Sequence, residues 1–234
     1  MGTGTLYYDC IVSHQGTVAG GKKMKKAEVS GFSKTRDLVM TGVFAAIIIV
    51  QTVVPFLGFI PLGIMNATII QVTVAIGAVL LGPKKGAFLG FVFGCASMTK
   101  NTFLPNATSF VFSPFVNIGG YGGNWRSVII CMVPRILIGV VSYAVFHQFD
   151  RRNKRKTGLI CGGAAAAVTN TVLVMSGIYF LFGREYAAAS GRTLNGLALV
   201  IMGIVGTQGI PEAIVSAVLT AAIGSALFKV RDNM

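Results

Sequence analysis

Charge is scarce in this chain. Asp, Glu, Lys and Arg together make up 12% of its 234 residues, whereas soluble domains carry about 25%. Hydrophobic residues make up 53%, and the mean hydropathy is +0.73. This composition excludes an ordinary soluble domain and predicts an all-α integral membrane protein. The length leaves room for roughly six transmembrane helices of about 20 residues each.

Enzymatic and nucleotide-binding motifs are also missing. The sequence contains no GxSxG, no HExxH and no paired carboxylates suited to acid–base chemistry. The segment from Gly16 to Lys23 resembles a phosphate-binding loop, but Lys23 stands where that loop requires Ser or Thr. We therefore expect a protein that is not an enzyme and uses no cofactor.

The few cysteines offer no obvious site either. The four cysteines are scattered at positions 10, 95, 131 and 161, without a CxxC pair and without a neighbouring histidine. This spacing fits neither a zinc site nor a disulfide framework. We expect no metal site, and we interpret the cysteines as packing residues.

Basic residues greatly outnumber acidic ones, and the formal net charge of +13 could indicate nucleic-acid binding. The Lys and Arg residues instead form short clusters between apolar segments, which is typical of membrane topology determinants. With six spans, fifteen of them fall on the side of the two termini and four on the other, at Lys100, Arg126, Arg184 and Arg192. Basic residues concentrate in cytoplasmic loops. The pattern predicts a multi-pass cell-membrane protein with both termini in the cytoplasm and no nucleic-acid partner.

Breaks in the apolar pattern divide the chain. The segment 38–83 contains no charged residue. As one straight helix it would be about 69 Å long, whereas the hydrocarbon core of a membrane is ~30 Å thick. Pro55 and Pro61 therefore mark a turn, either a plain hairpin or a mobile lid over a ligand. We predict a disordered polar tail over 1–33 and a membrane domain over 34–230. Its predicted helices are 37–55, 65–82, 86–102, 127–149, 158–182 and 211–228, with outer loops at 56–64, 103–126 and 183–210, the last including a partly inserted segment at 194–210.

Two predicted helices carry faces of small residues. Gly86, Gly90 and Gly94 recur every four residues along the helix at 86–102. In the helix at 37–55, Gly42 and Ala46 share the same spacing, with Ala45 beside them. Small residues let the backbones of neighbouring helices approach closely, which is a main source of packing energy in lipid. We expect each face to contact another helix.

Two ionisable residues lie inside predicted spans. Arg135 occurs in VPRILIG and Glu212 in GIPEAIVSA. Charged groups are costly in lipid and usually face a cavity or one another. Two interpretations remain open: a structural ion pair that ties the two helices together, or an Arg135 that neutralises an anionic substrate.

The loop before residue 127 is rich in amides, hydroxyls and rings. It predicts a binding site at the outer membrane surface, because these side chains supply hydrogen-bond donors, acceptors and apolar contacts. Trp125 has a second interpretation, as an interfacial anchor. The candidate substrate-binding residues are Asn66, Asn101, Asn106, Ser109, Asn117, Asn124, Trp125 and Arg135.

Five segments occur in a distinctive order: FLGFIPLGIMNATI, GAVLLGPKKGAFLGFVFG, TSFVFSPF, GNWRSVIICMVPRILIGV and GIPEAIVSAV. In this order the chain, over about residues 35–228, resembles the substrate-binding S components of energy-coupling factor (ECF) vitamin transporters. The resemblance implies six helices with both ends inside and a vitamin bound near the outer face. It also implies docking onto a transmembrane coupling protein and two ATPases. The docking face of that family falls on Gly42, Ala45 and Ala46 here.

Within this family the pattern most resembles the pantothenate type. Pantothenate is small and amphipathic, with a carboxylate, an amide and hydroxyl groups, and the polar loop and Trp125 suit such a ligand. Riboflavin and folate are alternatives, since larger aromatic ligands also use rings and amides. A different class of function also stays open, namely a membrane scaffold subunit whose outer loop binds a protein partner.

Overall fold

The structure is a computed structural model that describes residues 21–54, 58–61, 66–106, 108–118, 120–189 and 194–232. The chain divides into two compact units, Met1–Met40 and Thr41–Met234. The second unit holds every described helix and strand except the first part of helix α2 (Gly21–Val53).

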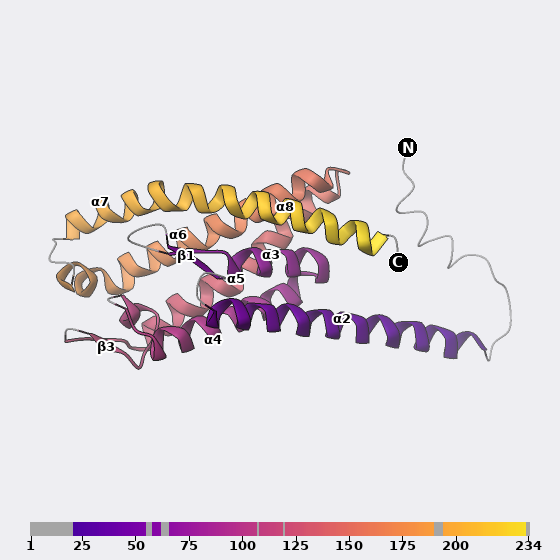
Figure 1. The fold of residues 1–234 in the computed structure, drawn as a ribbon, viewed down its shortest axis with the longest axis horizontal. Helices are drawn as coiled ribbons and strands as arrows, with labels where there is room; N and C mark the ends of the chain where they lie inside the picture. Colours follow the sequence, from indigo (N-terminus) through magenta and orange to yellow (C-terminus); the bar gives the residue numbers. More distant parts are fainter. Residues whose placement is uncertain are drawn as a thin grey trace. The chain divides into compact units, whose positions relative to one another are not determined.

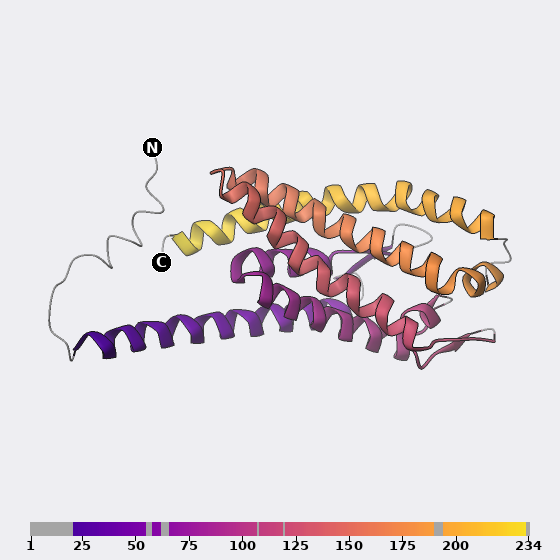
Figure 2. The same ribbon diagram turned by 180° about the vertical axis from the view of Figure 1, so that it is seen from behind.

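Helices dominate the described part of the chain (Figures 1 and 2). Two short antiparallel ribbons interrupt them, β1 with β2 and β3 with β4. The elements after α2 are β1 (Phe59–Pro61), β2 (Asn66–Thr68), α3 (Ile70–Leu81), α4 (Pro83–Phe103), the 3₁₀ turn η1 (Ser109–Val111), β3 (Asn117–Ile118), β4 (Tyr121–Gly122), α5 (Trp125–Asp150), α6 (Arg155–Ala189), α7 (Leu194–Ile204), the π-helical turn η2 (Val205–Gly209) and α8 (Ile210–Asp232).

The helices identify a membrane protein, as the composition predicts. Among the described residues, four stretches are long and apolar enough to cross a bilayer: Thr35–Val53, Trp125–Asp150, Arg155–Ala187 and Gly196–Val230. Helix α3 is apolar but has only 12 residues, a length of about 18 Å against a hydrocarbon core of ~30 Å. A helical membrane fold is thus confirmed, with four clear spanning candidates.

Several predicted helix boundaries differ from the structure. Helix α2 begins at Gly21 rather than near 37, so part of the expected tail continues the helix, while residues 1–20 lie outside the described part. Helix α3 begins at Ile70 rather than 65, because residues 66–68 form strand β2. Helices α4 and α5 match the predictions closely.

The second half of the chain departs from the prediction at two places. Helix α6 continues to Ala189, but Phe182 has non-helical backbone angles, so the predicted end at 182 coincides with a kink. The glycine-rich segment 194–210 does not form a separate inserted cap. It is helical and runs through η2 directly into α8, because the π turn absorbs the irregularity at 205–209 without ending the helix.

The connection between α2 and α3 contains a ribbon that sequence patterns did not predict. Strands β1 and β2 pair with Phe59 opposite Thr68 and Pro61 opposite Asn66. Gly58 precedes the ribbon, and an added Cβ there would lie 2.2 Å from the Gln51 carbonyl oxygen, so only glycine fits. Residues 55–57 and 62–65 lie outside the described part, and with them most of the predicted loop at 56–64.

The glycine face of α4 packs against α5, as its spacing predicts. An added Cβ on Gly90 would lie 2.1 Å from the carbonyl oxygen of Arg135, and one on Gly86 would lie 3.3 Å from that of Gly139. The approach is reciprocal, because a Cβ on Gly139 would lie 2.2 Å from the carbonyl oxygen of Gly86. An added Cβ on Gly94 would lie 2.6 Å from the Met132 sulfur and 3.4 Å from the Cys131 carbonyl oxygen. The two backbones therefore meet without intervening side chains.

Helix α3 forms the centre of the fold. Every residue from Ile70 to Val79 is buried, and the helix packs against α4, α5, α6 and α8. A helix that is apolar on all sides must be surrounded by protein or lipid, and α3 is surrounded by protein. Gln71 is a polar residue in this environment and is fully buried.

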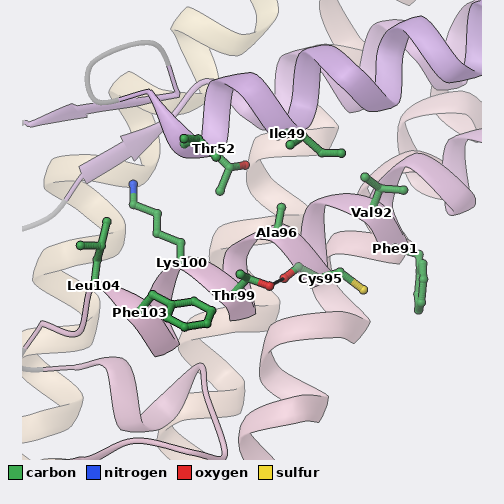
Figure 3. Close-up of a pocket in the computed structure, with 11 residues that line it drawn as sticks. Ile49, Thr52, Phe91, Val92, Cys95, Ala96, Thr99, Lys100, Phe103 and Leu104 are labelled. Carbon is green, nitrogen blue, oxygen red and sulfur yellow. Dashed lines mark hydrogen bonds between the residues drawn. The ribbon is translucent and has the colours of Figure 1, made fainter.

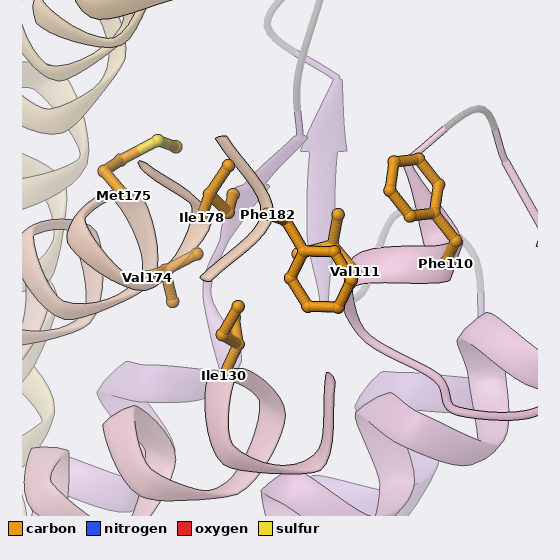
Figure 4. Close-up of a cluster of buried hydrophobic side chains, with 7 residues drawn as sticks. All are labelled: Phe110, Val111, Ile130, Val174, Met175, Ile178 and Phe182. Atoms are coloured by element: carbon orange, nitrogen blue, oxygen red, sulfur yellow. The ribbon is translucent and has the colours of Figure 1, made fainter. Parts of the chain in front are cut away.

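The loop between α4 and α5 is folded onto the ends of α5 and α6. Phe110 of η1 is buried beside Phe182, with ring centroids 6.0 Å apart in an edge-to-face arrangement. Figure 4 shows Phe110 and Val111 facing the cluster formed by Ile130, Val174, Met175, Ile178 and Phe182. The Ser127 hydroxyl donates to the Phe110 carbonyl oxygen over 2.8 Å. These contacts hold residues 108–118 and 120–127 against α5 and α6; this segment is called the outer cap below, after the side of the membrane that the sequence predicts for it.

The close contact between α4 and α5 generates a stability prediction. Gly90→Ala places a methyl group where the Arg135 backbone stands, and overpacking of this kind costs roughly 1–3 kcal/mol. We expect a clear fall in the melting temperature of the detergent-purified protein. Gly42→Ala is the matched control, since no described neighbour lies within 4 Å of its added Cβ. Equal melting temperatures for the two variants would contradict the packing.

Candidate functional site

Five buried side chains carry polar atoms that lack hydrogen-bond partners in the described part of the chain: Ser142 and Thr220 carry one atom each, and Gln71, Arg135 and Asn170 carry the other four. Gln71 is 0% exposed, Arg135 7% and Asn170 9%. In the described part of the chain, no hydrogen bond reaches Nε2 or Oε1 of Gln71, Nε of Arg135 or Oδ1 of Asn170. A buried polar group without a partner costs about 1–3 kcal/mol. Such a concentration of unpartnered groups points to a ligand.

Arg135 and Asn170 lie at the same level of the helix bundle. Helices α5 and α6 are antiparallel neighbours: Gly162 abuts Ser142 near one end, and Gly177 abuts Ile130 near the other. Each helix rises 1.5 Å per residue. Asn170 lies about midway between the two contacts on α6, as Arg135 does on α5, so the two side chains belong to one layer.

Helices α8 and α3 bring two further polar side chains to this layer. Gly209 abuts Thr171, the residue after Asn170, which places the start of α8 beside it. Glu212 of α8 accepts a hydrogen bond from the Thr68 backbone N–H over 3.1 Å. The Gln71 side chain lies beside that carboxylate. We call Gln71, Arg135, Asn170 and Glu212 the buried polar cluster.

Arg135 is held by its own helix and by two aromatic rings. Its Nη1 donates to the Ile130 carbonyl oxygen over 3.0 Å. Its guanidinium carbon lies 5.6 Å from the centroid of the Phe93 ring and 5.3 Å from that of Phe112. Cation–π contacts at these distances stabilise a desolvated cation. Phe112 belongs to the outer cap, so the cap lies directly against this side chain.

The direct ion pair proposed between Arg135 and Glu212 is not present in the described part of the chain. Their charges interact electrostatically, but Glu212 bonds the Thr68 amide and Arg135 bonds the Ile130 carbonyl oxygen. Each charged group therefore has a local partner of its own.

The cluster offers a specific set of chemical groups. Arg135 provides a cation with parallel N–H donors, the geometry that matches a carboxylate. Gln71 and Asn170 provide amides, which both donate and accept hydrogen bonds, and Glu212 provides an acceptor for hydroxyl or amide protons. No bond-making chemistry follows from this set. It suits recognition of a small anionic molecule with several polar groups.

Three of the outer-loop residues predicted to bind substrate bond one another. The Ser109 hydroxyl donates to Oδ1 of Asn101 over 2.9 Å and lies 3.0 Å from Oδ1 of Asn106. The Asn101 amide also donates to the Ser97 carbonyl oxygen, and Asn106 accepts from the Thr108 amide. The structure brings these residues together, and their contacts fix the join between α4 and the outer cap.

Asn124 and Trp125 lie at the start of α5. The Asn124 side chain accepts from the Arg126 amide, while the Ser127 hydroxyl accepts from the Asn124 amide, which makes a capping box. Trp125 is 67% exposed, an arrangement typical of an interfacial anchor. Neither residue belongs to the buried polar cluster.

Asn117 and Asn66 lie in the two ribbons. Asn117 is exposed in β3, and its side chain lies against Gly122 of the paired strand. Asn66 forms the start of β2, opposite Pro61. The structure describes the backbone of Asn66 alone. Among the predicted site residues whose side chains the structure describes, Arg135 is the one that joins the buried polar cluster.

Sequence reasoning missed Gln71 and Asn170. Both are uncharged polar residues in otherwise apolar helices, TIIQVTVAIGAVLL and AAAAVTNTVLV. The signal that could have found them is an amide side chain within a largely apolar helix of a membrane protein, because a polar group in lipid is costly unless it has a partner.

A separate apolar groove runs between α2 and α4 (Figure 3). Its volume is about 480 Å³. The hydroxyls of Thr52 and Thr99 donate to the carbonyl oxygens of Ile48 and Cys95 in their own helices, so the two threonines turn methyl groups toward the groove. The groove suits hydrocarbon rather than a polar ligand. Its lining residues are Ile49, Thr52, Val53, Phe91, Val92, Cys95, Ala96, Thr99, Lys100, Phe103 and Leu104.

The predicted docking face on α2 is open in the described part of the chain. Gly42 and Ala46 are exposed and Ala45 is half-buried, whereas Phe44 and Ile48 turn inward. No described neighbour lies within 4 Å of a Cβ added to Gly42. This small-residue face therefore contacts no described helix of its own unit.

Comparison with known proteins agrees with these features. The profile of a family described as "ECF transporter, substrate-specific component" matches residues 36–224. The pantothenic acid transporter PanT of Lactococcus lactis subsp. cremoris is 35% identical over 205 residues, covering 86% of this chain and 98% of that protein. The pantothenate transporter PanT of Leuconostoc mesenteroides is 34% identical over 210 residues, covering 86% and 96%. The chain belongs to the substrate-specific components of ECF transporters.

Proposed function

We propose that this S component binds pantothenate in the buried polar cluster and delivers it to an ATP-driven module for uptake. The observation that carries the proposal is the set of unpartnered buried polar atoms on Gln71, Arg135 and Asn170. Two relatives, matched over 86% of this chain and over almost their own full length, are named for pantothenate. Pantothenate carries the groups that this set lacks: a carboxylate, an amide and hydroxyls.

Each group of the ligand has a counterpart in the cluster. The Arg135 guanidinium pairs with the carboxylate, because a charge-assisted hydrogen bond in a dry site is stronger than a neutral one. The amides of Gln71 and Asn170 pair with the ligand amide and a hydroxyl. The Glu212 carboxylate, which already accepts from Thr68, accepts a second hydroxyl proton.

The outer cap and the β1–β2 ribbon cover this position. Phe112 of the cap contacts Arg135, and Thr68 of the ribbon contacts Glu212. A ligand that enters from the outer surface therefore has to pass one of the two. Either element closing over the ligand would exclude water and strengthen its polar contacts.

The alternative vitamins fit less well. Riboflavin and folate carry extended aromatic rings, which need flat apolar surfaces for stacking. The two rings next to the cluster, Phe93 and Phe112, both face the Arg135 guanidinium. That arrangement favours a small polar ligand over a large aromatic one.

A titration of purified variants tests the site. Gln71→Leu removes two unpartnered atoms, so the empty protein should melt no lower than the wild type. Bound pantothenate would lose its hydrogen bonds to the Gln71 amide, which should weaken binding by about 5- to 150-fold. Thr73→Val is the matched control on the same helix: its hydroxyl donates to Gln51, so stability should fall while affinity stays. The reverse pattern, or unchanged affinity in both variants, would place the site elsewhere.

We further propose six spans with both termini in the cytoplasm, which the fifteen-to-four distribution of basic residues supports. In a cysteine-free background, Asn117→Cys should react with a membrane-impermeant maleimide on intact cells. Lys154→Cys, in the connection between α5 and α6, should react only after the cells are opened. Labelling of position 154 on intact cells would reverse the orientation.

The exposed small-residue face of α2 is proposed to dock onto a transmembrane coupling protein that works with two ATPases. Gly42→Leu fills the space needed for close helix approach, so pantothenate uptake by cells should be lost while binding to the purified protein is unchanged. Val43→Leu is the control, since Val43 is exposed and already bulky. Equal loss of binding and uptake in Gly42→Leu would show that this face packs within the S component.

A further inference from the structure

Helix α5 contains an interior proline. Pro134 is buried and is the tenth residue of a helix that continues to Asp150. Proline lacks an N–H group, so the carbonyl oxygen four residues earlier loses its regular helical partner. In α5 that oxygen belongs to Ile130, which is itself buried.

The next residue supplies the missing donor. The Arg135 side chain turns back along the helix, and its Nη1 donates to the Ile130 carbonyl oxygen over 3.0 Å. If residue 134 carried an N–H, that oxygen would already accept the helical hydrogen bond. The proline and the arginine therefore form a unit in which one residue creates the acceptor that holds the other.

This bond decides which edge of the guanidinium stays free. Nη1 is the one nitrogen of the group with a hydrogen bond in the described part of the chain, and Nε is buried without a partner. Nε and Nη2 form the side edge of the group, whose two parallel N–H donors match the two oxygens of a carboxylate. Phe93 and Phe112 contact the guanidinium as well. Rotation away from this orientation would break the Ile130 bond.

We infer that Pro134 is a positioning residue for ligand recognition: by freeing the Ile130 carbonyl oxygen it fixes Arg135 with its carboxylate-binding edge toward the buried polar cluster. This inference rests on the proposed function, because it assigns the ligand carboxylate to Arg135. It makes Pro134 a determinant of selectivity for acids over neutral analogues, although its own side chain offers no polar group.

The test compares two ligands that differ at one group. Pantothenol carries a primary alcohol where pantothenate carries the carboxylate. In Pro134→Ala the new N–H bonds Ile130 and releases Nη1, so the affinity for pantothenate should fall by about tenfold. The affinity for pantothenol should stay the same. The melting temperature of the empty protein should not fall, since a regular helical hydrogen bond replaces an interior proline.

Two further variants complete the design. In an Arg135→Gln background, Pro134→Ala should cause no additional loss of pantothenate affinity, because the positioned group is already absent. Pro83→Ala is the matched control, since Pro83 occupies the first turn of α4, where its missing N–H leaves no carbonyl oxygen without a partner. It should leave the affinity for both ligands unchanged.

The outcomes separate the two proposals. A Pro134→Ala protein that binds both ligands like the wild type overturns the positioning role alone, and so does one that loses both ligands equally. Additive losses in the Arg135→Gln background also overturn it. A wild-type protein that binds no pantothenate overturns the proposed function, and the positioning role with it.

Discussion

The approach of α4 to α5 at Gly90 is the contact on which the rest of the structure depends. It brings the backbone of α4 against the Arg135 carbonyl oxygen, which places Phe93 of α4 over the guanidinium of the same arginine. Because lipid offers no competing hydrogen bonds and little hydrophobic drive between helices, such close packing is what holds the bundle together. A bulkier residue at Gly90 would separate the helices and change both the packing and the position of the buried cation.

The outer cap and the membrane interior act as one assembly. Phe110 and Phe112 belong to the same short segment. The first packs on Phe182 at the end of α6, and the second lies over the Arg135 guanidinium inside the bundle. The amides and hydroxyls of the loop hold this segment in place through Asn101, Asn106 and Ser109. The polar loop thus reaches the candidate site through an aromatic ring.

The sequence predicted the membrane class, most helix positions and the glycine face of α4, because each follows from local composition or spacing. It did not predict the ribbons, because strands of two or three residues, such as 59–61 and 66–68, are too short to show a period in the sequence. For the site, Arg135 was identifiable as a charge in lipid. The loop asparagines were predicted to bind the ligand, but asparagine also caps helices and closes turns, and Asn124 caps α5 in this way. Only the fold distinguishes the two uses.

The hydrogen bond from Thr68 to Glu212 joins residues 144 positions apart in the chain. Helix α8 is the last described helix, so its carboxylate enters the membrane after the segments that carry Gln71, Arg135 and Asn170. During synthesis these three polar residues are therefore made before the Glu212 carboxylate, which is the last member of the buried polar cluster. Long-range contacts of this kind form late and slowly. The candidate site is consequently complete only when the last described helix is in place, so its assembly requires nearly the whole membrane part of the chain.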